Sequence, residues 1–146
     1  METICLEPIG VIHSPFKSTA EIPRQSIYAA DTRATIELRE DLADGLYTLE
    51  ESPYIMVLFY FHQADPCILQ QRSHHDPNLR GVFATRSPAR PNPIGMTIVK
   101  LIGINGNCLE IQGIDMLDGT PVLDIKPYSA GLNPPFEQPN ESVTKG

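Results

Sequence analysis

The feature that most constrains the fold is an Asn-Gly turn between two apolar, strand-like runs. Residues 97–104 (TIVKLIGI) and 108–114 (CLEIQGI) flank Asn105-Gly106-Asn107. Asn-Gly is the strongest short-range hairpin signal, because both residues tolerate the positive φ of tight hairpin turns. Gly103 and Gly113 lie toward the middle and end of the two runs, where a bulge would let a sheet curve toward closure. The sequence therefore predicts an antiparallel hairpin here.

Other short runs predict further strands. Residues 9–12 and 122–125 are short and apolar, and residues 34–38 alternate as a half-buried strand does. Residues 54–61 (YIMVLFYF) lack polar alternation, which predicts a strand buried on both faces. Leucines at 42, 46 and 49 have helical spacing, but Gly45 limits them to a short helix.

Five or six short strands with little helix predict a mainly β protein. We expect a small closed, mostly antiparallel β-barrel, because closure removes exposed strand edges. A chain of 146 residues is long enough for one domain with a core and too short for two ordinary ones. We therefore expect a barrel domain over residues 1–130 and an irregular tail over 131–146.

Composition narrows the classes of function. The longest apolar run, residues 55–61, is far below the roughly 20 residues that cross a bilayer, so no membrane partner is expected. Three cysteines without CxxC spacing indicate neither a disulfide framework nor a zinc site, and they favour the cytoplasm. The adjacent histidines 74 and 75 do not share a face, so we predict no metal site. A net charge of −7 means that a nucleic-acid partner would need a local basic patch.

The stretch 81–95 (GVFATRSPARPNPIG) combines three prolines with two arginines. Proline fixes its own φ and pushes the preceding residue toward extended geometry, so neither a helix nor a central strand can continue through it. A stiff loop carrying Arg86, Arg90 and Asn92 has already lost much of the entropy that binding costs. It is either a ligand-binding loop or a rigid connector whose arginines are solvated or paired with carboxylates.

Polar residues gather at strand ends. They form three groups: residues 14–16, residues 62–63, and the pair of segments 86–96 and 115–128. If the strands are neighbours, the groups converge on one rim, with Ser14 and His62 serving either a ligand or the scaffold. No Ser-His or Cys-His pair suggests covalent catalysis, and no GxGxxG or GxxxxGK[ST] motif is present. The groups suit binding of a charged, polar cofactor and orientation of a second substrate.

Five motifs carry a resemblance to a known family. They are IGVIHSPF at 9–16, IPRQ at 22–25, VLFYFHQ at 57–63, GVFATRSPARPNPIGM at 81–96 and DMLDGTPVLDIKPY at 115–128. The chain resembles the TrmO family, also called TsaA-like or YaeB-like, of S-adenosylmethionine-dependent tRNA methyltransferases. The resemblance implies a closed β-barrel and a homodimer with its cofactor near the subunit interface. Residues 53–56 read PYIM where the family commonly has Ser-His-Ile/Leu-Trp.

The resemblance also implies the site. Its cofactor contacts fall on Ser14, Pro15, Phe16, His62, Gln63, Arg86, Met96, Asp115, Met116, Leu117 and Asp118. The family methylates the adenine nitrogen that carries a threonylcarbamoyl group, beside the anticodon of tRNA. Alternatives are methyl transfer to another acceptor and a non-catalytic S-adenosylmethionine-binding module.

The chemistry suggests further roles. Transfer from a sulfonium is an in-line displacement, which needs positioning but neither a metal nor a covalent intermediate. Arg86 can fork onto the cofactor carboxylate, while Asp115 or Asp118 can accept hydrogen bonds from ribose hydroxyls or the ammonium group. A general base is expected, and Asp124 or Tyr128 is our candidate. Substrate contacts are predicted at Arg90, Asn92 and Lys126; alternatively, Asp124 and Lys126 simply pair at the barrel mouth.

Overall fold

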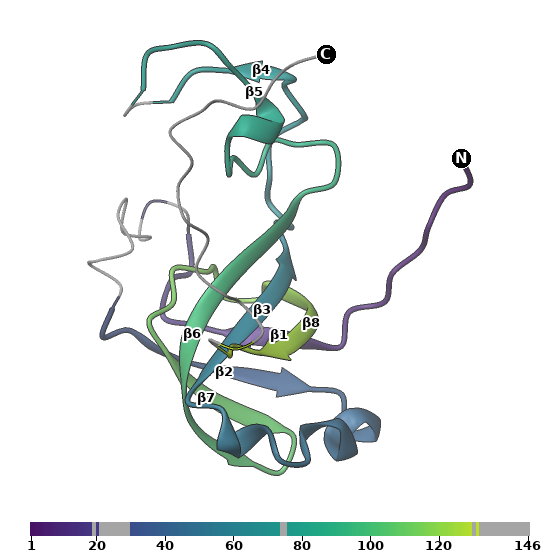
Figure 1. Ribbon diagram of the computed structural model, residues 1–146, viewed down its shortest axis with the longest axis vertical. Coiled ribbons are helices and arrows are strands. Elements are labelled where there is room, and N and C mark those ends of the chain that lie inside the picture. The colour runs from purple at the N-terminus through teal and green to yellow at the C-terminus, as the bar shows by residue number, and fades with distance from the viewer. Residues whose placement is uncertain (19, 21–29, 74–75, 130, 132–146) are drawn as a thin grey trace.

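The protein, seen in a computed structural model, is built on a closed antiparallel β-barrel (Figure 1). The structure describes residues 1–18, 20, 30–73, 76–129 and 131. The predicted tail from residue 132, the motif at 22–25 and the two histidines at 74 and 75 lie outside the described residues. Within the described part, six strands close in the order β1-β2-β7-β6-β3-β8. Their bounds are β1 Gly10–His13, β2 Arg33–Leu38, β3 Tyr54–Tyr60, β6 Ile94–Asn105, β7 Cys108–Gln112 and β8 Pro121–Pro127. The predicted fold class is confirmed.

The barrel interior is filled by alternate side chains of every strand. In β2 the buried positions are every second residue, and the residues between them are exposed or half-buried. Small barrels pack their interior with side chains and leave no channel. Fully buried members of this core are Ile12, Ile36, Ile55, Val57, Leu109, Ile111 and Val122.

The predicted hairpin is confirmed, but its loop is shifted by one residue. Asn105 pairs with Cys108, so the two-residue loop is Gly106-Asn107. Gly106 has φ +63° and Asn107 has no positive φ, which is the pattern of turns that place glycine first. The register shifts between Leu101 and Gly103, which confirms a bulge near Gly103. That bulge lets β6 pair with β3 along its first half and with β7 along its second.

The prediction that residues 54–61 are buried on both faces is wrong. In β3 the buried residues alternate with exposed or half-buried ones. Its outward positions face the outward positions of β6, in the pairs Met56–Ile98, Leu58–Met96 and Tyr60–Ile94. A closed barrel has only one interior, so the apolar residues of the other face lie on its outside. The result is an exposed apolar surface over β3 and β6.

The proline-rich loop also differs in extent from its prediction. It ends at Pro93, and Ile94–Met96 belong to β6 because they pair with Leu58–Tyr60. Residues 61–93, here called the extension, rise from the ends of β3 and β6 above the barrel (Figure 1). The extension contains β4 Gln70–Gln71, β5 Arg80–Gly81 and the 3₁₀ turn η5 Val82–Ala84.

The helical structure described is short. The leucines at 42, 46 and 49 fall in two 3₁₀ segments, η3 Glu40–Leu46 and η4 Leu49–Glu51, at the barrel end opposite the extension (Figure 1). Across the described residues, no helix has the length and apolar character needed to cross a membrane.

Candidate functional site

A cavity of about 750 Å³ lies where the extension meets the barrel. It is bounded by the end of β3, the start of β6, the loop before β6 and the segment before β8. Among its lining residues are seven predicted cofactor contacts: His62, Gln63, Arg86, Met96, Asp115, Met116 and Leu117. Its volume is in the range of sites that enclose small organic ligands. The structure therefore brings together residues that are up to 55 positions apart in sequence.

Four polar side chains of this cavity have no partner in the described part of the chain, whereas the Thr120 hydroxyl donates to the Leu117 carbonyl. Arg86, Asp115, His62 and Gln63 make no side-chain hydrogen bond or ion pair with another described residue. His62 and Asp115 are half-buried, whereas Gln63 and Arg86 are exposed. Polar groups in a concave site normally find partners, so a converging set without them is available to a ligand.

Aromatic residues form an apolar wall of the cavity. Phe59 is 6% exposed, and its ring lies 5.0 Å from that of Phe61 in an edge-to-face arrangement. Gly95 faces Phe59 across the β3–β6 pairing, and a Cβ at position 95 would lie 2.4 Å from the Phe59 ring. The Phe61 N–H donates to the Pro93 carbonyl at 2.8 Å. The glycine thus makes room for the ring, and the proline loop is fastened beside it.

The Asp115–Asp118 segment is held in place by the residues after β1. Ser14 Oγ donates to the Met116 carbonyl at 2.7 Å, and the Ser14 N–H donates to Asp118 Oδ1 at 2.9 Å. Ser14 Oγ also accepts from the Phe16 N–H, as in a capped turn. In return, the Phe16 carbonyl accepts from the Asp118 N–H at 2.8 Å. Ser14 thus caps this turn, as its scaffold alternative expects.

Asp118 is fixed by charge as well. Lys17 Nζ lies 2.9 Å from Asp118 Oδ2. This hydrogen bond, followed by that from the Ser14 N–H, holds the pKa of the Asp118 carboxyl below its ordinary value. The next residue, Gly119, has φ +81°, and a Cβ added to it would lie 4.0 Å from His62 Nε2. Asp118 thus belongs to the framework of the turn, and the glycine after it lies close to His62.

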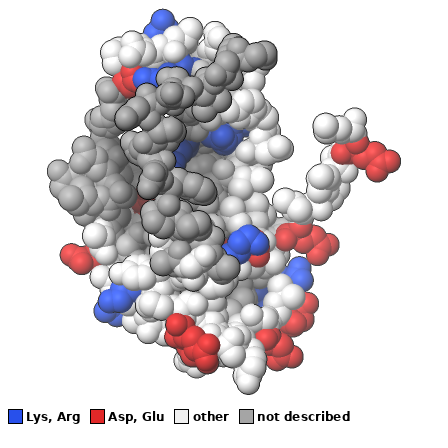
Figure 2. Space-filling model, viewed as in Figure 1, with Lys and Arg blue, Asp and Glu red and all other residues white. Residues whose placement is uncertain are grey.

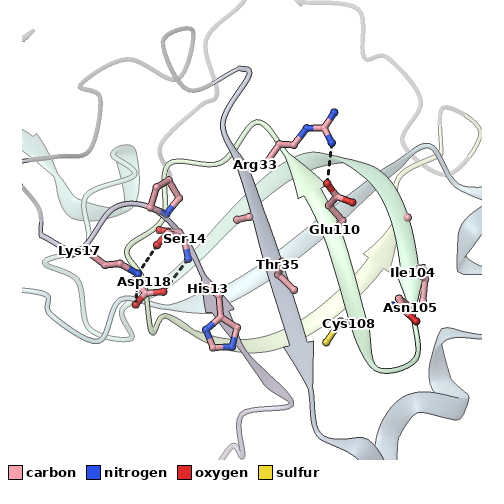
Figure 3. Close-up of a pocket in the computed structure, with 13 residues that line it drawn as sticks. His13, Ser14, Lys17, Arg33, Thr35, Ile104, Asn105, Cys108, Glu110 and Asp118 are labelled. Carbon is pink, nitrogen blue, oxygen red and sulfur yellow. Dashed lines mark hydrogen bonds and ion pairs between the residues drawn. The ribbon is translucent and has the colours of Figure 1, made fainter.

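Ser14, Pro15 and Asp118 line a second, shallow cavity of about 730 Å³ on the outside of β1, β2 and β7 (Figure 3). Its charged groups are paired with one another: Lys17 with Asp118, and Arg33 with Glu110 at 2.9 Å. Such a surface offers a ligand fewer free groups than the cavity at the extension. We therefore place the candidate site in the cavity at the extension. Ser14 and Asp118 support the segment that lines it.

The predicted substrate contacts in the proline loop lie outside the cavity lining. Arg90 Nη1 donates to the carbonyls of Thr85 and Ser87, at 3.0 and 3.1 Å. Among the described residues this guanidinium has no carboxylate partner, and it does not line the cavity; it links the proline loop internally. Asn92 is exposed, and its carbonyl accepts from the Ile94 N–H at 2.7 Å.

The predicted base and the lysine beside it lie away from the cavity. Asp124 Oδ2 pairs with Lys126 Nζ at 2.8 Å, and Asp124 lines a separate cavity beside η3 and η4. Tyr128 donates its N–H to the carbonyl of Tyr54, the first residue of β3. His62 lies beyond the opposite end of that strand, which ends at Tyr60. The pairing alternative for Asp124 and Lys126 is therefore what the structure contains. Within one chain, β8 carries Asp124 and Lys126 toward the other end of the barrel, and Tyr128 directly follows it.

Several lining residues escaped sequence reasoning. They are Phe59, Phe61, Ala64, Pro88, Thr97, Ile98, Gly113 and Thr120. Phe59 and Phe61 belong to an apolar run that predicts a strand. No local sequence pattern distinguishes a phenylalanine packed in the core from one that lines a cavity. The described residues include no group of three or more His, Cys, Asp or Glu side chains placed to hold a metal ion.

Comparison with known proteins identifies the family. The family described as "tRNA-methyltransferase O N-terminal domain" matches residues 11–133. The chain belongs to this family. It is 42% identical over 128 residues to an "S-adenosyl-L-methionine-binding protein" of Archaeoglobus fulgidus, which covers 88% of this chain and 91% of the relative.

Longer TrmO relatives share the same region. The chain is 38% identical over 137 residues to the human "tRNA (adenine(37)-N6)-methyltransferase", covering 88% of this chain and 31% of the human protein. The crystal structure of TrmO from Pseudomonas aeruginosa superimposes with a TM-score of 0.79 at 41% identity, covering 95% of this chain and 62% of that one. The chain thus spans about a third of the human enzyme and under two thirds of the bacterial one.

Proposed function

We propose that this protein binds S-adenosylmethionine in the cavity at the extension and transfers its methyl group to N6 of adenosine 37 in tRNA. The observation that carries the proposal is a set of four polar side chains that converge there beside two phenylalanines and have no partner among the described residues. The cofactor combines a carboxylate, an ammonium group, ribose hydroxyls and a purine, so it needs both kinds of surface. The printed names of the relatives, a cofactor-binding protein and a tRNA methyltransferase, support this choice.

Each of these polar groups has a complementary part of the cofactor. Arg86 offers a planar fork of donors, the geometry that binds a carboxylate through two parallel hydrogen bonds. Asp115 accepts hydrogen bonds from hydroxyl or ammonium groups, and Gln63 can both donate and accept. Phe59, Phe61 and Met116 supply the apolar contacts. Bound there, the cofactor supplies an activated methyl group, and the protein's task is to hold donor and acceptor in line.

The finer proposal is that the acceptor adenosine already carries a threonylcarbamoyl group on N6. A nitrogen conjugated to both a purine and a carbonyl is a poor nucleophile, so its proton must leave at or before transfer. His62 and Asp115 are the cavity's groups able to take up a proton. Analysis of tRNA nucleosides by mass spectrometry, with and without the gene, tests the acceptor. Loss of the methylated threonylcarbamoyl nucleoside is expected on deletion, and an unchanged level would point to another acceptor.

Cofactor binding is tested by calorimetry with S-adenosylmethionine. Arg86→Ala removes charge-assisted hydrogen bonds worth about 1.5–3 kcal/mol, which corresponds to roughly a 10- to 150-fold loss of affinity. Arg86→Lys keeps the charge without the fork and should lie between wild type and Arg86→Ala. Arg39→Lys is the matched control, since Arg39 precedes η3 at the barrel end opposite the extension and does not line the cavity. Equal affinities for all four proteins would place the cofactor elsewhere.

Catalysis and mere cofactor binding are separated by product analysis. The A. fulgidus relative is named for cofactor binding alone. A non-catalytic module would bind S-adenosylmethionine yet release no S-adenosylhomocysteine with tRNA from a strain lacking the gene. We expect tRNA-dependent release of S-adenosylhomocysteine, and its absence would favour the binding module. A cytoplasmic site of action belongs to the same proposal.

The proposal includes a homodimer formed through the apolar surface over β3 and β6. Its exposed members include Tyr60 at 41%, Ile94 at 39%, Met96 at 47% and Ile98 at 43%. Apolar residues clustered on a paired strand face are typical of an interaction surface. Because Met96 and Ile98 also line the cavity, a second copy seated there would contribute to the site. Light scattering should show a dimer for wild type and a monomer for Ile98→Asp; a monomeric wild type would contradict this part.

A further inference from the structure

The basic residues of this acidic protein are unevenly distributed. The extension, residues 61–93, carries four arginines against two aspartates, a net charge of +2. Because the whole chain has a net charge of −7, the remainder carries −9. Figure 2 shows mostly basic atoms at the extension end of the molecule and acidic ones predominating around the barrel end. The extension is thus the local basic patch that an anionic partner would require.

Three of the extension's arginines line one cavity of about 360 Å³ between β5 and the proline loop. They are Arg72, Arg80 and Arg86, and Asp76 is the acidic residue among them. Arg86 lines both this arginine cavity and the proposed cofactor cavity. The two hollows therefore adjoin through a single side chain.

The arginines are anchored in a way that leaves their ends free. Arg72 Nε donates to the Pro77 carbonyl at 3.1 Å, and Arg80 Nε pairs with Asp76. Within the described residues, the terminal Nη groups of Arg72 and Arg80 have no partner. A guanidinium held through Nε has lost part of its rotational freedom, while its two terminal nitrogens remain able to bind a phosphate. Phe83, in η5 of the same extension, is 79% exposed and offers a flat face on which a base can stack.

We infer that the extension is the RNA-binding surface, where Arg72 and Arg80 contact phosphates and Phe83 stacks on a base. The inference rests on the proposed function and specifies how its tRNA is held. An RNA strand that runs along Arg72 and Arg80 toward Arg86 reaches the cavity where the methyl donor is proposed to bind. The acidic barrel repels phosphates elsewhere, so a small basic surface is enough to orient the RNA.

Binding of tRNA from a strain lacking the gene, measured by filter retention over a range of salt concentrations, tests the inference. For Arg72→Gln or Arg80→Gln we expect on the order of a fivefold loss of affinity at about 0.1 M salt. The plot of log affinity against log salt concentration has a negative slope, and its magnitude should decrease by about 0.7–0.9 for each arginine removed. Phe83→Ala should weaken binding roughly 5- to 150-fold without changing that slope, because stacking releases no counterions. Affinity for S-adenosylmethionine should stay unchanged.

Arg39→Gln is the matched control, because Arg39 precedes η3 at the other end of the barrel and pairs with Glu7 and Asp41. It should leave tRNA affinity and salt slope as in wild type. If wild type methylates tRNA and the extension variants bind it equally well, the surface is wrong while the function stands. An equal loss in Arg39→Gln would also overturn the assignment, because the effect would not be local. If wild type binds S-adenosylmethionine but neither binds nor methylates tRNA, the proposed function itself fails.

Discussion

Replacing Gly95 by alanine should distort the cavity from its apolar side. A Cβ at this position would lie 2.4, 2.6 and 2.9 Å from three ring atoms of Phe59. Real Cβ atoms essentially never approach so closely, so the ring or β6 must move. The ring cannot swing into solvent, because it is 6% exposed and packs against Phe61. Overpacking of this kind typically costs about 1–3 kcal/mol.

The structure supplies a control on the same strand. Gly103 has no atom within 4 Å of an added Cβ and has no positive φ, so Gly103→Ala should be nearly neutral. For Gly95→Ala, a loss of about 2 kcal/mol lowers the melting temperature by roughly 4–8 °C for a chain of this size. Thermal unfolding followed by circular dichroism measures both. Affinity for S-adenosylmethionine should fall in Gly95→Ala alone, since Phe59 lines its proposed cavity.

A second substitution separates the contact from a general effect of alanine. Phe59→Leu removes the outer ring atoms that the new Cβ would meet. In the Phe59→Leu background, Gly95→Ala should therefore cost much less than in wild type, giving a coupling free energy on the order of 1 kcal/mol. If Gly95→Ala melts with Gly103→Ala and binds the cofactor like wild type, the close approach inferred here is wrong.

Two further perturbations test the segment before β8. Asp118→Asn should make the free energy of unfolding less sensitive to acid. In the folded state Lys17 and the Ser14 N–H lower the pKa of the Asp118 carboxyl. The carboxylate therefore contributes its full stabilisation above the ordinary pKa of about 3.9 and loses it as the pH falls through the lower folded value. Denaturant titrations between about pH 2 and 6 should therefore show a smaller loss for the variant, and parallel curves would contradict this. Gly119→Ala forces a non-glycine residue to φ +81°, which costs roughly 1–2 kcal/mol, and it should weaken cofactor affinity through the neighbouring His62. A variant as stable as wild type would count against the observed backbone conformation.

Much of the barrel was predictable because its signals are local. The alternation of residues 34–38 and the hairpin around Gly106 depend on neighbours within a few positions; the strand and the hairpin match the structure, and only the loop is shifted by one residue. The start of β6 was missed because Pro91 and Pro93 dominate the local pattern there. Pairing of residues 94–96 with residues 58–60 is a contact across 34 or more positions, which no local pattern expresses.

The site was predicted unevenly for a similar reason. Motif positions located His62, Gln63, Arg86 and Asp115, and the fold gathers them. Whether a residue near the end of a strand faces the cavity depends on the strand's direction and register. β8 leaves the cavity at Pro121 and runs antiparallel to β3, with a register shift between Leu58 and Phe59. Asp124 is therefore outside the cavity, although it lies only nine positions from Asp115 in the sequence.

The distribution of hydrogen-bond partners divides the polar residues in and beside the TrmO-like motifs into two groups. Ser14, Lys17 and Asp118 bond to one another and to the backbone around them, so changing one of them alters the shape of the turn. Arg86 and Asp115 have no partner among the residues that the structure describes, so their hydrogen-bonding groups are open to a ligand. A group in the first set, when replaced, should change stability and ligand affinity together. A group in the second should change affinity with little effect on stability, and this difference separates the framework from the binding surface by measurement.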